Sequence, residues 1–285
     1  MHAPLISRFA PSPTGRLHLG HAYSAMRAHD LARAGGGRFL LRIEDIDPGR
    51  CRPEHVAGII EDLHWLGLDW DEPPLFQSAR LPLYAAALDR LKAMDLIYPC
   101  FCTRARIAAE IAASASAPHG PDGPLYPGLC RALSADERAA RIAAGEAHAW
   151  RLDCTRGAAL AGPLHWHDEQ AGRVTARPEV HGDVVLARKD APTSYHLAVT
   201  VDDAAQGISD VVRGRDLFEA THVHRLLQAL LGLPTPLYHH HGLLTDADGN
   251  RLAKRAGSPS LASMREAGAD PAAILTQLRE ARATA

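Results

Sequence analysis

The sequence has 285 residues, of which 46% are hydrophobic and 22% charged, and its formal net charge is −2. This composition is typical of a globular protein with a sizeable core, and it excludes proteins that bind nucleic acid through bulk positive charge. No apolar run approaches the roughly 20 residues of a membrane-spanning helix, and residues 1–5 do not resemble a signal peptide. We therefore expect a cytoplasmic protein without membrane contact, and any RNA contact to come from a local patch.

The first half of the chain has the pattern of a βαβ unit followed by helices. The predicted elements are a strand over 5–10, a turn over 11–15, a helix over 19–34, a strand over 38–43 and helices over 53–66 and 80–94. Prolines and a glycine build the turn, and three glycines end the first helix. Strand, helix and strand at this spacing indicate a parallel sheet.

The second half predicts another βαβ unit after a less regular stretch. The predicted elements are an irregular segment over 99–130 with one short helix at 104–113, a helix over 134–144, short strands and turns over 150–185, buried strands over 195–201 and 238–244 with a helix over 221–231 between them, and a helical tail over 261–278. Ser134 and Glu137 have the spacing of a capping box. The expected fold class is α/β.

A string of turn residues and histidines opens the first predicted helix. It reads Pro-Ser-Pro-Thr-Gly-Arg-Leu-His-Leu-Gly-His over residues 11–21. The N-terminus of a helix offers free N–H groups and a positive dipole end to an anion, and Gly20 permits close approach of the backbone. His18 and His21 share one helix face and are able to donate hydrogen bonds to ATP phosphates. For the histidines alone, a surface pair or a metal-binding pair are the other interpretations.

The string resembles the HIGH motif of class I aminoacyl-tRNA synthetases. Residues 8–15 with 17–21 are similar to the glutamate- and glutamine-specific branch of that family, and residues 42–47, Arg-Ile-Glu-Asp-Ile-Asp, match a second landmark of the branch. The resemblance implies a Rossmann-like (HUP) parallel sheet. It also implies that the chain activates glutamate by adenylation, with ATP and Mg²⁺ as the substrate pair.

The resemblance further implies which residues bind glutamate. They are Arg8, Phe9, Ala10, Pro11, Ser12, Glu44, Tyr195 and Arg213. The side-chain carboxylate needs a buried cation, which an arginine supplies best, and the α-ammonium group needs a carboxylate such as Glu44. Without the resemblance, Arg213 and Arg215 could equally form a basic surface pair near acidic neighbours. Glu44 could equally be a capping residue or pair with a neighbouring side chain.

A basic segment, Arg251-Leu252-Ala253-Lys254-Arg255, lies where class I enzymes carry a mobile lysine loop. It is similar to the KMSKS-like pattern, but Arg251 replaces the first lysine and Ala253 the serine. The resemblance implies that Lys254 binds ATP and stabilises the pyrophosphate leaving group. Taken alone, a basic pentapeptide is typical of a solvated loop.

Three of the five cysteines lie in the irregular segment, as Cys100-Phe101-Cys102 and Cys130. Thiolates at this spacing suit a structural zinc ion, which orders a stretch too poor in apolar residues to order itself. The standard choices for the fourth ligand are Cys154, His119 and His148. The pattern C-x-C followed by Y-x-x-x-C resembles the zinc site of the glutamyl-Q tRNA(Asp) synthetases, which implies Tyr126 instead. Three free thiols in a partly buried loop are the other interpretation.

Residues 239–241 are three consecutive histidines. Neighbours in a strand face opposite sides of the sheet, so the three do not converge on one metal ion. We predict that they are strand-end residues near the nucleotide.

The chain ends soon after the predicted lysine loop, whereas the larger glutamyl-tRNA synthetases carry a further anticodon-binding portion. This length, with the Y-x-x-x-C feature, is similar to the glutamyl-Q tRNA(Asp) synthetases. The resemblance implies glutamate activation without tRNA and transfer of glutamate to the queuosine base at the wobble position of tRNA(Asp). The expected partner is the anticodon stem-loop of that tRNA, and the expected state is a monomer.

We predict four parts of the chain. They are the first half of the catalytic domain (1–98), an inserted zinc-bearing subdomain (99–185), the second catalytic half (186–245), and the lysine loop with C-terminal helices (246–285). Two other functions stay open: a truncated glutamyl-tRNA synthetase that charges another acceptor, and a catalytically silent paralogue that binds RNA.

Overall fold

The computed structural model describes residues 4–113, 119–120, 123–244 and 259–281. The elements of the first part are β1 (Ile6–Phe9), α1 (Leu19–Ala34), β2 (Arg38–Ile43), α2 (Pro53–Trp65), β3 (Leu75–Phe76), η1 (Gln77–Arg80), α3 (Leu81–Ala93), β4 (Ile97–Cys100), α4 (Arg104–Ala113), β5 (His119–Gly120) and β6 (Gly123–Pro124). Those of the second part are α5 (Ala135–Ala143), β7 (Ala149–Leu152), α6 (Cys154–Ala161), β8 (His165–Asp168), β9 (Gly172–Thr175), η2 (Pro178–His181), β10 (Val185–Ala187), α7 (Tyr195–Ala205), β11 (Asp210–Gly214), η3 (Arg215–Leu217), α8 (Ala220–Leu231), β12 (Leu237–His241), α9 (Leu261–Glu266) and α10 (Pro271–Glu280).

Two parallel β-sheets meet at the centre of the molecule, as the α/β class requires. One has the order β1-β2-β3 and the other β11-β12-β8-β9, in which only the β8–β9 pair is antiparallel. The two sheets join where the backbone N–H of Ser209 donates to the Ile6 carbonyl at 3.0 Å. β1 and β11 therefore lie side by side, and they are followed by different helices: α1 comes after β1, and α8 comes after β11. In open α/β sheets, ligands bind outside the carboxyl ends of the strands at such a switch point.

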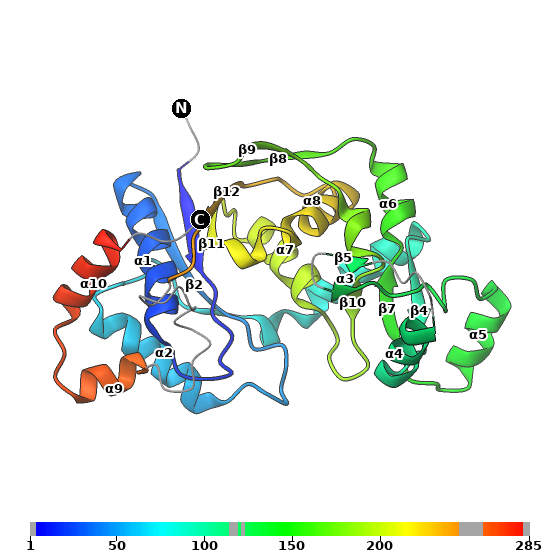
Figure 1. Ribbon diagram of the computed structural model, residues 1–285, viewed down its shortest axis with the longest axis horizontal. Coiled ribbons are helices and arrows are strands. Elements are labelled where there is room, and N and C mark those ends of the chain that lie inside the picture. Colours follow the sequence, from blue (N-terminus) through cyan, green and yellow to red (C-terminus); the bar gives the residue numbers. More distant parts are fainter. Residues whose placement is uncertain (1–3, 114–118, 121–122, 245–258, 282–285) are drawn as a thin grey trace.

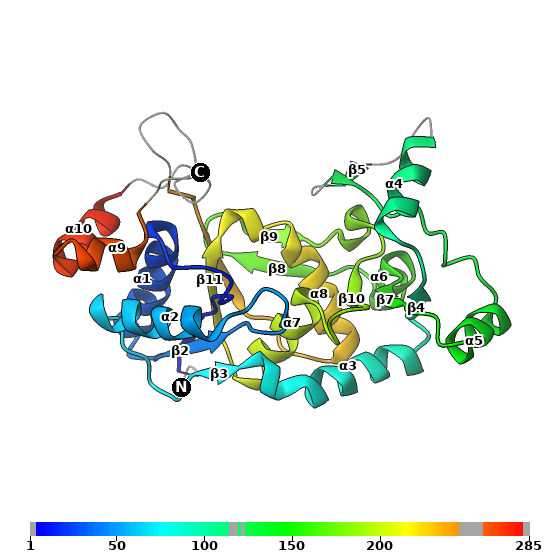
Figure 2. The ribbon, with the colours of Figure 1, turned by 90° about the horizontal axis from the view of Figure 1, so that it is seen from below.

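The first βαβ unit forms where the sequence predicted it. β2 is buried along almost its whole length because the parallel sheet is covered on both faces, and α1 packs on β1, β2 and β11. The C-terminal helices close the far side of this core: α9 contacts α2, and α10 contacts α1. Figure 1 shows α1, α9 and α10 at one end of the elongated molecule and α4 and α5 at the other, and Figure 2 gives the same arrangement from below.

The predicted strand over 195–201 is wrong, because the segment forms helix α7. Every residue from Leu197 to Asp203 is buried, since α7 packs against both α3 and α8. A helix that is buried on all sides has no polar face, and over a short run its sequence cannot be told from that of a buried strand. The second βαβ unit instead uses β11, which the sequence analysis did not predict, with α8 and β12.

Two further differences concern helix ends. α6 lies in a stretch predicted as strands and turns, and it begins at Asp153, whose side chain accepts a hydrogen bond from the Arg156 N–H. The predicted helical tail divides into α9 and α10, since Gly268 has a φ of 77° and Asp270 caps a new helix. The helix over 104–113 and the Ser134–Glu137 capping box are confirmed.

The segment between the two halves has its own small sheet. β4, β7 and β10 form an antiparallel sheet in the order β10-β7-β4, and α4 and α5 extend from it (Figure 1). Within the described ranges, no helix has the length and apolar character that crossing a membrane requires.

Candidate active site and metal centre

A cavity of about 380 Å³ lies at the carboxyl ends of β1 and β11. Its walls come from the loop after β1, the start of α1, and the ends of β11 and β12. The lining residues from the predicted site are Phe9, Ala10, Pro11, Ser12, His18, Gly20, His21 and Arg213. The structure therefore brings the first sequence motif and a residue of the second βαβ unit to one opening.

His18 and His21 cap the N-terminus of α1 reciprocally. The Nδ1 atom of His18 accepts from the Gly20 N–H at 3.1 Å, and Nδ1 of His21 accepts from the His18 N–H at 3.3 Å. Burial lowers the pKa of His18, and burial followed by the neighbouring His18 lowers the pKa of His21 to about 4. Both rings are therefore neutral at pH 7. Because each Nδ1 accepts, the single proton of each ring lies on Nε2, which is able to donate to a ligand.

Gly20 lies against the His18 ring. A Cβ atom at this position would lie 3.1 Å from Cε1 and 3.2 Å from Nδ1 of His18. A larger residue would therefore displace the His18 ring by a few tenths of an ångström from its position over the helix start. The sequence analysis had assigned Gly20 to close approach of a nucleotide, and the structure adds this role in holding a histidine.

A second cavity of about 290 Å³ adjoins the first. Arg8, Ala10, Ser12, Glu44, Tyr195, Arg213 and Leu217 line it. Four of these residues also line the first cavity, so the two spaces are continuous along the β1–β11 junction. All four side chains that the sequence predicted for the ends of a glutamate molecule lie here.

Three buried arginines lie in or next to this second cavity: Arg8 and Arg213 line it, and Arg42 contacts its lining residue Glu44. Two of the three have carboxylate partners. Arg8 makes a bidentate contact with Asp203, at 2.9 Å from Nε and 3.2 Å from Nη2. Arg42 lies 2.8 Å from Asp203 and 3.5 Å from Glu44. Burial raises the pKa of Asp203, but Arg8 and Arg42 outweigh it and hold that pKa below its usual range. The charges of these four residues balance.

Glu44 is nearly fully buried at the edge of this network. Burial raises its pKa to about 7, against the opposing effect of Arg42 and Arg8. Its contact with Arg42 is at the long end for an ion pair, so the carboxylate is incompletely paired. A ligand ammonium group placed here would restore the charged form.

Arg213 is the third arginine, and within the described part of the chain it forms no ion pair. It is only 6% exposed, which excludes the surface pair with Arg215. Its partners are all uncharged acceptors: Tyr195, Thr221 and the rings of His224 and His240. A buried guanidinium with neutral partners attracts an anion, so the second cavity carries a positive end at Arg213 and a carboxylate at Glu44.

The consecutive histidines of β12 have different partners, as strand geometry predicts. His239 contacts Asp210 and Glu169, whereas the His240 ring lies between Asp168 and Arg213. His241 lines the first cavity and contacts Ser24 at 2.9 Å. His240 is thus more than a strand-end residue, because it contacts Arg213, which has no carboxylate partner among the described residues.

Lys254 and the rest of the predicted lysine loop lie outside the described residues. Of the described residues that flank this segment, Leu244 lines the first cavity, and Ser260 forms a backbone bridge with His18.

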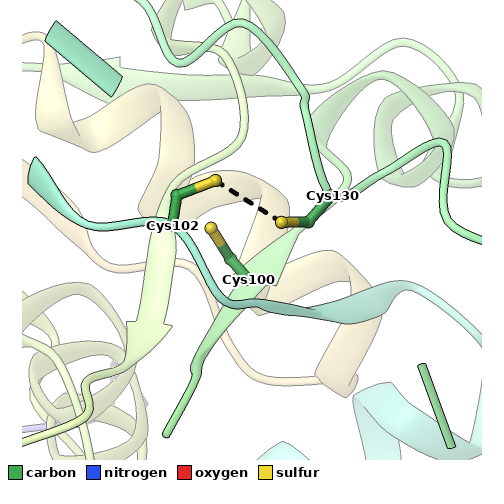
Figure 3. Close-up of side chains that lie close together, drawn as sticks. All are labelled: Cys100, Cys102 and Cys130. Carbon is green, nitrogen blue, oxygen red and sulfur yellow. Dashed lines mark hydrogen bonds between the residues drawn. The ribbon is translucent and has the colours of Figure 1, made fainter. Parts of the chain in front are cut away.

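Cys100, Cys102 and Cys130 converge at the far end of the molecule. Their sulfur atoms all lie within 4.8 Å of one another, and Figure 3 shows the three thiol groups directed toward a common centre. The Tyr126 hydroxyl oxygen lies 3.4 Å from Sγ of Cys100 and 3.7 Å from Sγ of Cys102. Four sulfur or oxygen donors from two segments thus surround one point. Among the described residues, this is the group of His, Cys and acidic side chains able to hold a metal ion.

Two of the three alternative fourth ligands, Cys154 and His148, are not part of this cluster. Cys154 lies on α6, inside the apolar cluster that contains Leu152 and Leu226. His148 directs Nδ1 to the Glu146 carbonyl at 3.0 Å. The side chain of His119 lies outside the described residues.

Comparison with known proteins assigns the chain to a family. Residues 4–284 match the family model of class I tRNA synthetases (E and Q), catalytic domain. A glutamyl-Q tRNA(Asp) synthetase of Rhodobacter capsulatus is 53% identical over 95% of this chain and 98% of its own length, and one of Symbiobacterium thermophilum is 45% identical over 96% and 85%. This chain belongs to the glutamyl-Q tRNA(Asp) synthetase family.

A solved structure agrees with this family. A glutamate tRNA ligase from Elizabethkingia meningosepticum, solved in complex with its amino acid, superimposes with a TM-score of 0.75 and 26% identity. The match covers 93% of this chain but 53% of the ligase, so the chain spans about half of that larger protein. The class I catalytic fold predicted from the sequence is confirmed.

The donor atoms at the cysteine cluster fit the ligand set of a structural zinc ion. Structural zinc sites use four ligands, most often thiolates, and a small segment with few apolar residues is where they occur. Three buried thiols with one hydroxyl match this number. The structure supports a metal-binding cluster, and the identity of the metal belongs to the proposal below.

Proposed function

We propose that this chain activates glutamate with ATP, without tRNA, and transfers it to the queuosine base at the wobble position of tRNA(Asp). The observation that carries the proposal is the pair of adjoining cavities at the β1–β11 junction. One opens on two neutral imidazoles at a helix start, and the other has the uncompensated Arg213 facing the incompletely paired Glu44. An amino acid with an anionic side chain fits the second cavity, and its α-carboxylate then reaches toward the first.

In the first step, an oxygen of the glutamate α-carboxylate attacks the α-phosphorus of ATP. The new P–O bond forms as the bond to the bridging oxygen breaks, and pyrophosphate leaves with that electron pair. Arg213 and the Tyr195 hydroxyl hold the side-chain carboxylate, and Glu44 holds the ammonium group. Mg²⁺ that is bound with ATP would partly neutralise the negative charge of the phosphates.

Residues of the first cavity stabilise the charge that develops in this step. The Nε2–H groups of His18 and His21 donate to phosphate oxygens, in a position fixed beforehand by the reciprocal cap. Lys254, from the KMSKS-like segment, binds the departing pyrophosphate. Arg8 keeps the β1 side of the glutamate cavity in place through Asp203. Ala10 and Ser12 line that cavity, whereas Phe9 and Pro11 line the first.

In the second step, a hydroxyl oxygen on the queuosine ring attacks the carbonyl carbon of the adenylate. Its proton passes to the departing AMP phosphate, the bond to that phosphate breaks, and an ester forms. The anticodon stem-loop is the part of tRNA(Asp) that must enter. Since the chain has a formal net charge of −2, its contact with RNA is local and is weakened by salt. ATP and tRNA are cytoplasmic substrates, and we expect the enzyme to act there as a monomer.

Exchange of labelled pyrophosphate into ATP tests the activation step directly. We expect exchange that depends on glutamate and proceeds without any tRNA, with glutamine and aspartate at least about 100-fold poorer substrates. Glutamate-dependent exchange excludes a silent RNA-binding paralogue. An absolute requirement for tRNA would contradict activation without tRNA, and equal activity with glutamine would contradict the proposed role of Arg213.

We also propose that Cys100, Cys102, Cys130 and Tyr126 hold one structural zinc ion. Elemental analysis of the purified protein is expected to give about one zinc per chain. Cys154→Ser should retain that zinc, because Cys154 lies in a separate apolar cluster. Tyr126→Phe should lose zinc faster to a chelator, because it removes one of four ligands. Retained zinc in Tyr126→Phe together with loss in Cys154→Ser would reverse the assignment.

A further inference from the structure

Arg213 is a buried arginine that uncharged hydrogen-bond acceptors hold in place, with no carboxylate partner among the described residues. Four of its five N–H groups have acceptors among the described residues. The contacts are Nε to His240 Nε2 at 3.1 Å, Nη1 to the Tyr195 hydroxyl at 3.2 Å and to His224 Nδ1 at 3.3 Å, and Nη2 to the Thr221 hydroxyl at 2.6 Å. A carboxylate in any of these positions would form an ion pair and compete with an anionic substrate.

The direction of each hydrogen bond around Arg213 follows from chemistry. A guanidinium only donates, so His224 must accept at Nδ1 and carry its proton on Nε2. That Nε2 lies 3.1 Å from Nδ1 of His196, to which it donates. By the same rule His240 accepts at Nε2 and donates from Nδ1 to Asp168 at 2.8 Å. Each ring is therefore held in one tautomer by a partner behind it.

The charge states agree with this geometry. Burial, and then the positive charge of Arg213, hold the pKa of His224 well below its usual range. The same two causes lower the pKa of His240 to about 3, against the opposing effect of Asp168. Both rings are neutral at pH 7. Asp168 hydrogen-bonds to the His240 ring, which lies between it and Arg213.

Comparison with Arg8 shows what this arrangement avoids. Arg8 lines the same cavity, but Asp203 takes its guanidinium by two hydrogen bonds. Arg8 is thus a neutralised, structural cation. At Arg213, the uncharged acceptor His224 contacts the guanidinium where Arg8 has a carboxylate.

We propose that His224, oriented by His196, is a positioning residue that determines specificity. It fixes the Arg213 fork by a neutral acceptor and so leaves the full charge of that arginine for the carboxylate of the amino acid. This inference rests on the proposed activation of glutamate. It adds that discrimination between glutamate and its uncharged amide depends on a residue that does not line the cavity.

Two variants that differ only in charge test the inference. In His224→Asn the side-chain oxygen stands where Nδ1 stood and remains a neutral acceptor, whereas His224→Asp puts a carboxylate there. In the intact enzyme, we expect His224→Asn to keep KM for glutamate within about threefold of the wild type. His224→Asp should raise KM for glutamate about 10- to 100-fold and lower the glutamate-to-glutamine ratio of kcat/KM, with KM for ATP unchanged.

An equal loss in both variants, or no loss in His224→Asp, would overturn the inference. Should His224→Asp fail to fold, ¹⁵N NMR of the wild-type imidazoles supplies the test: His224 should be neutral with its proton on Nε2 from pH 6 to 8. A protonated ring or the opposite tautomer would overturn it. If the wild type catalysed pyrophosphate exchange with a different acidic amino acid, the glutamate proposal would be contradicted, but the expected difference between the two variants would still hold. Pyrophosphate exchange with neutral amino acids alone would overturn both the glutamate proposal and the inference about His224.

Discussion

Replacing Arg213 with glutamine is expected to reduce kcat/KM for glutamate in pyrophosphate exchange by at least about 1000-fold. Arg213 is the buried cation at the second cavity that has no carboxylate partner among the described residues. Without it, the substrate carboxylate would have to leave water for a site whose other lining arginine, Arg8, is already paired with Asp203. KM for ATP should change far less than KM for glutamate, since the phosphates are placed at His18 and His21 of the first cavity.

Arg215→Gln is the matched control for this prediction. It removes the same charge two residues away, from an exposed side chain whose guanidinium lies 5.6 Å from the Phe218 ring. Its exchange kinetics should equal those of the wild type, and thermal unfolding should show both variants folded. A similar loss in both variants would mean that general positive charge, and not the Arg213 fork, attracts glutamate.

Replacing His21 with asparagine is expected to lower kcat for pyrophosphate exchange by about 100- to 1000-fold. The asparagine oxygen takes the place of Nδ1 and still accepts from the His18 N–H, so the start of α1 stays capped. The Nε2–H donor is lost, and with it the stabilisation of charge on the phosphates. Because that charge grows in the transition state, kcat should fall more than KM for ATP rises.

The same change at His29 controls for loss of a histidine from the helix. His29 lies further along α1, with its ring against Phe39 at 5.3 Å between centroids, and does not line either cavity. His29→Asn should retain full kcat. If His21→Asn behaved like His29→Asn, the two histidines would be a helix cap without a part in catalysis.

The sequence allowed these histidines to be found because all their determinants are local. A strand, a turn of prolines and glycine, and a helix start place both rings at the sheet edge within a single stretch of chain. The tautomers of the two rings were not predictable, since they depend on hydrogen bonds from the N–H groups of His18 and Gly20 that form only in the folded cap. The contact between Gly20 and the His18 ring likewise exists only in the folded cap.

The partners of the predicted arginines could not be found in the same way. Asp203 joins Arg8 and Arg42 across separations of 195 and 161 residues. Its position depends on α7 being a helix, which turns Asp203 toward β1 and β2 and Asp202 toward Gln77 and Tyr84. The prediction of a strand there left both carboxylates without a place. His224 was equally hidden, because nothing local marks a buried histidine on an amphipathic helix as the partner of an arginine.

The cysteine cluster lies between these two cases. Spacing alone predicted that Cys100, Cys102 and Cys130 would converge, and the structure brings them together. The fourth group was ambiguous by spacing, and the family resemblance implied Tyr126. Its hydroxyl oxygen now lies beside two of the three thiols and accepts from the Cys130 N–H at 2.9 Å.

The acceptor of the activated glutamate is the central claim, and transfer to tRNA tests it most directly. Labelled glutamate should be incorporated into tRNA(Asp) that carries queuosine, in the presence of ATP. The same tRNA lacking queuosine, and tRNA(Glu), should take up none. Incorporation into tRNA(Asp) with and without queuosine, or into tRNA(Glu) instead, would contradict the account and identify a synthetase that charges a different acceptor.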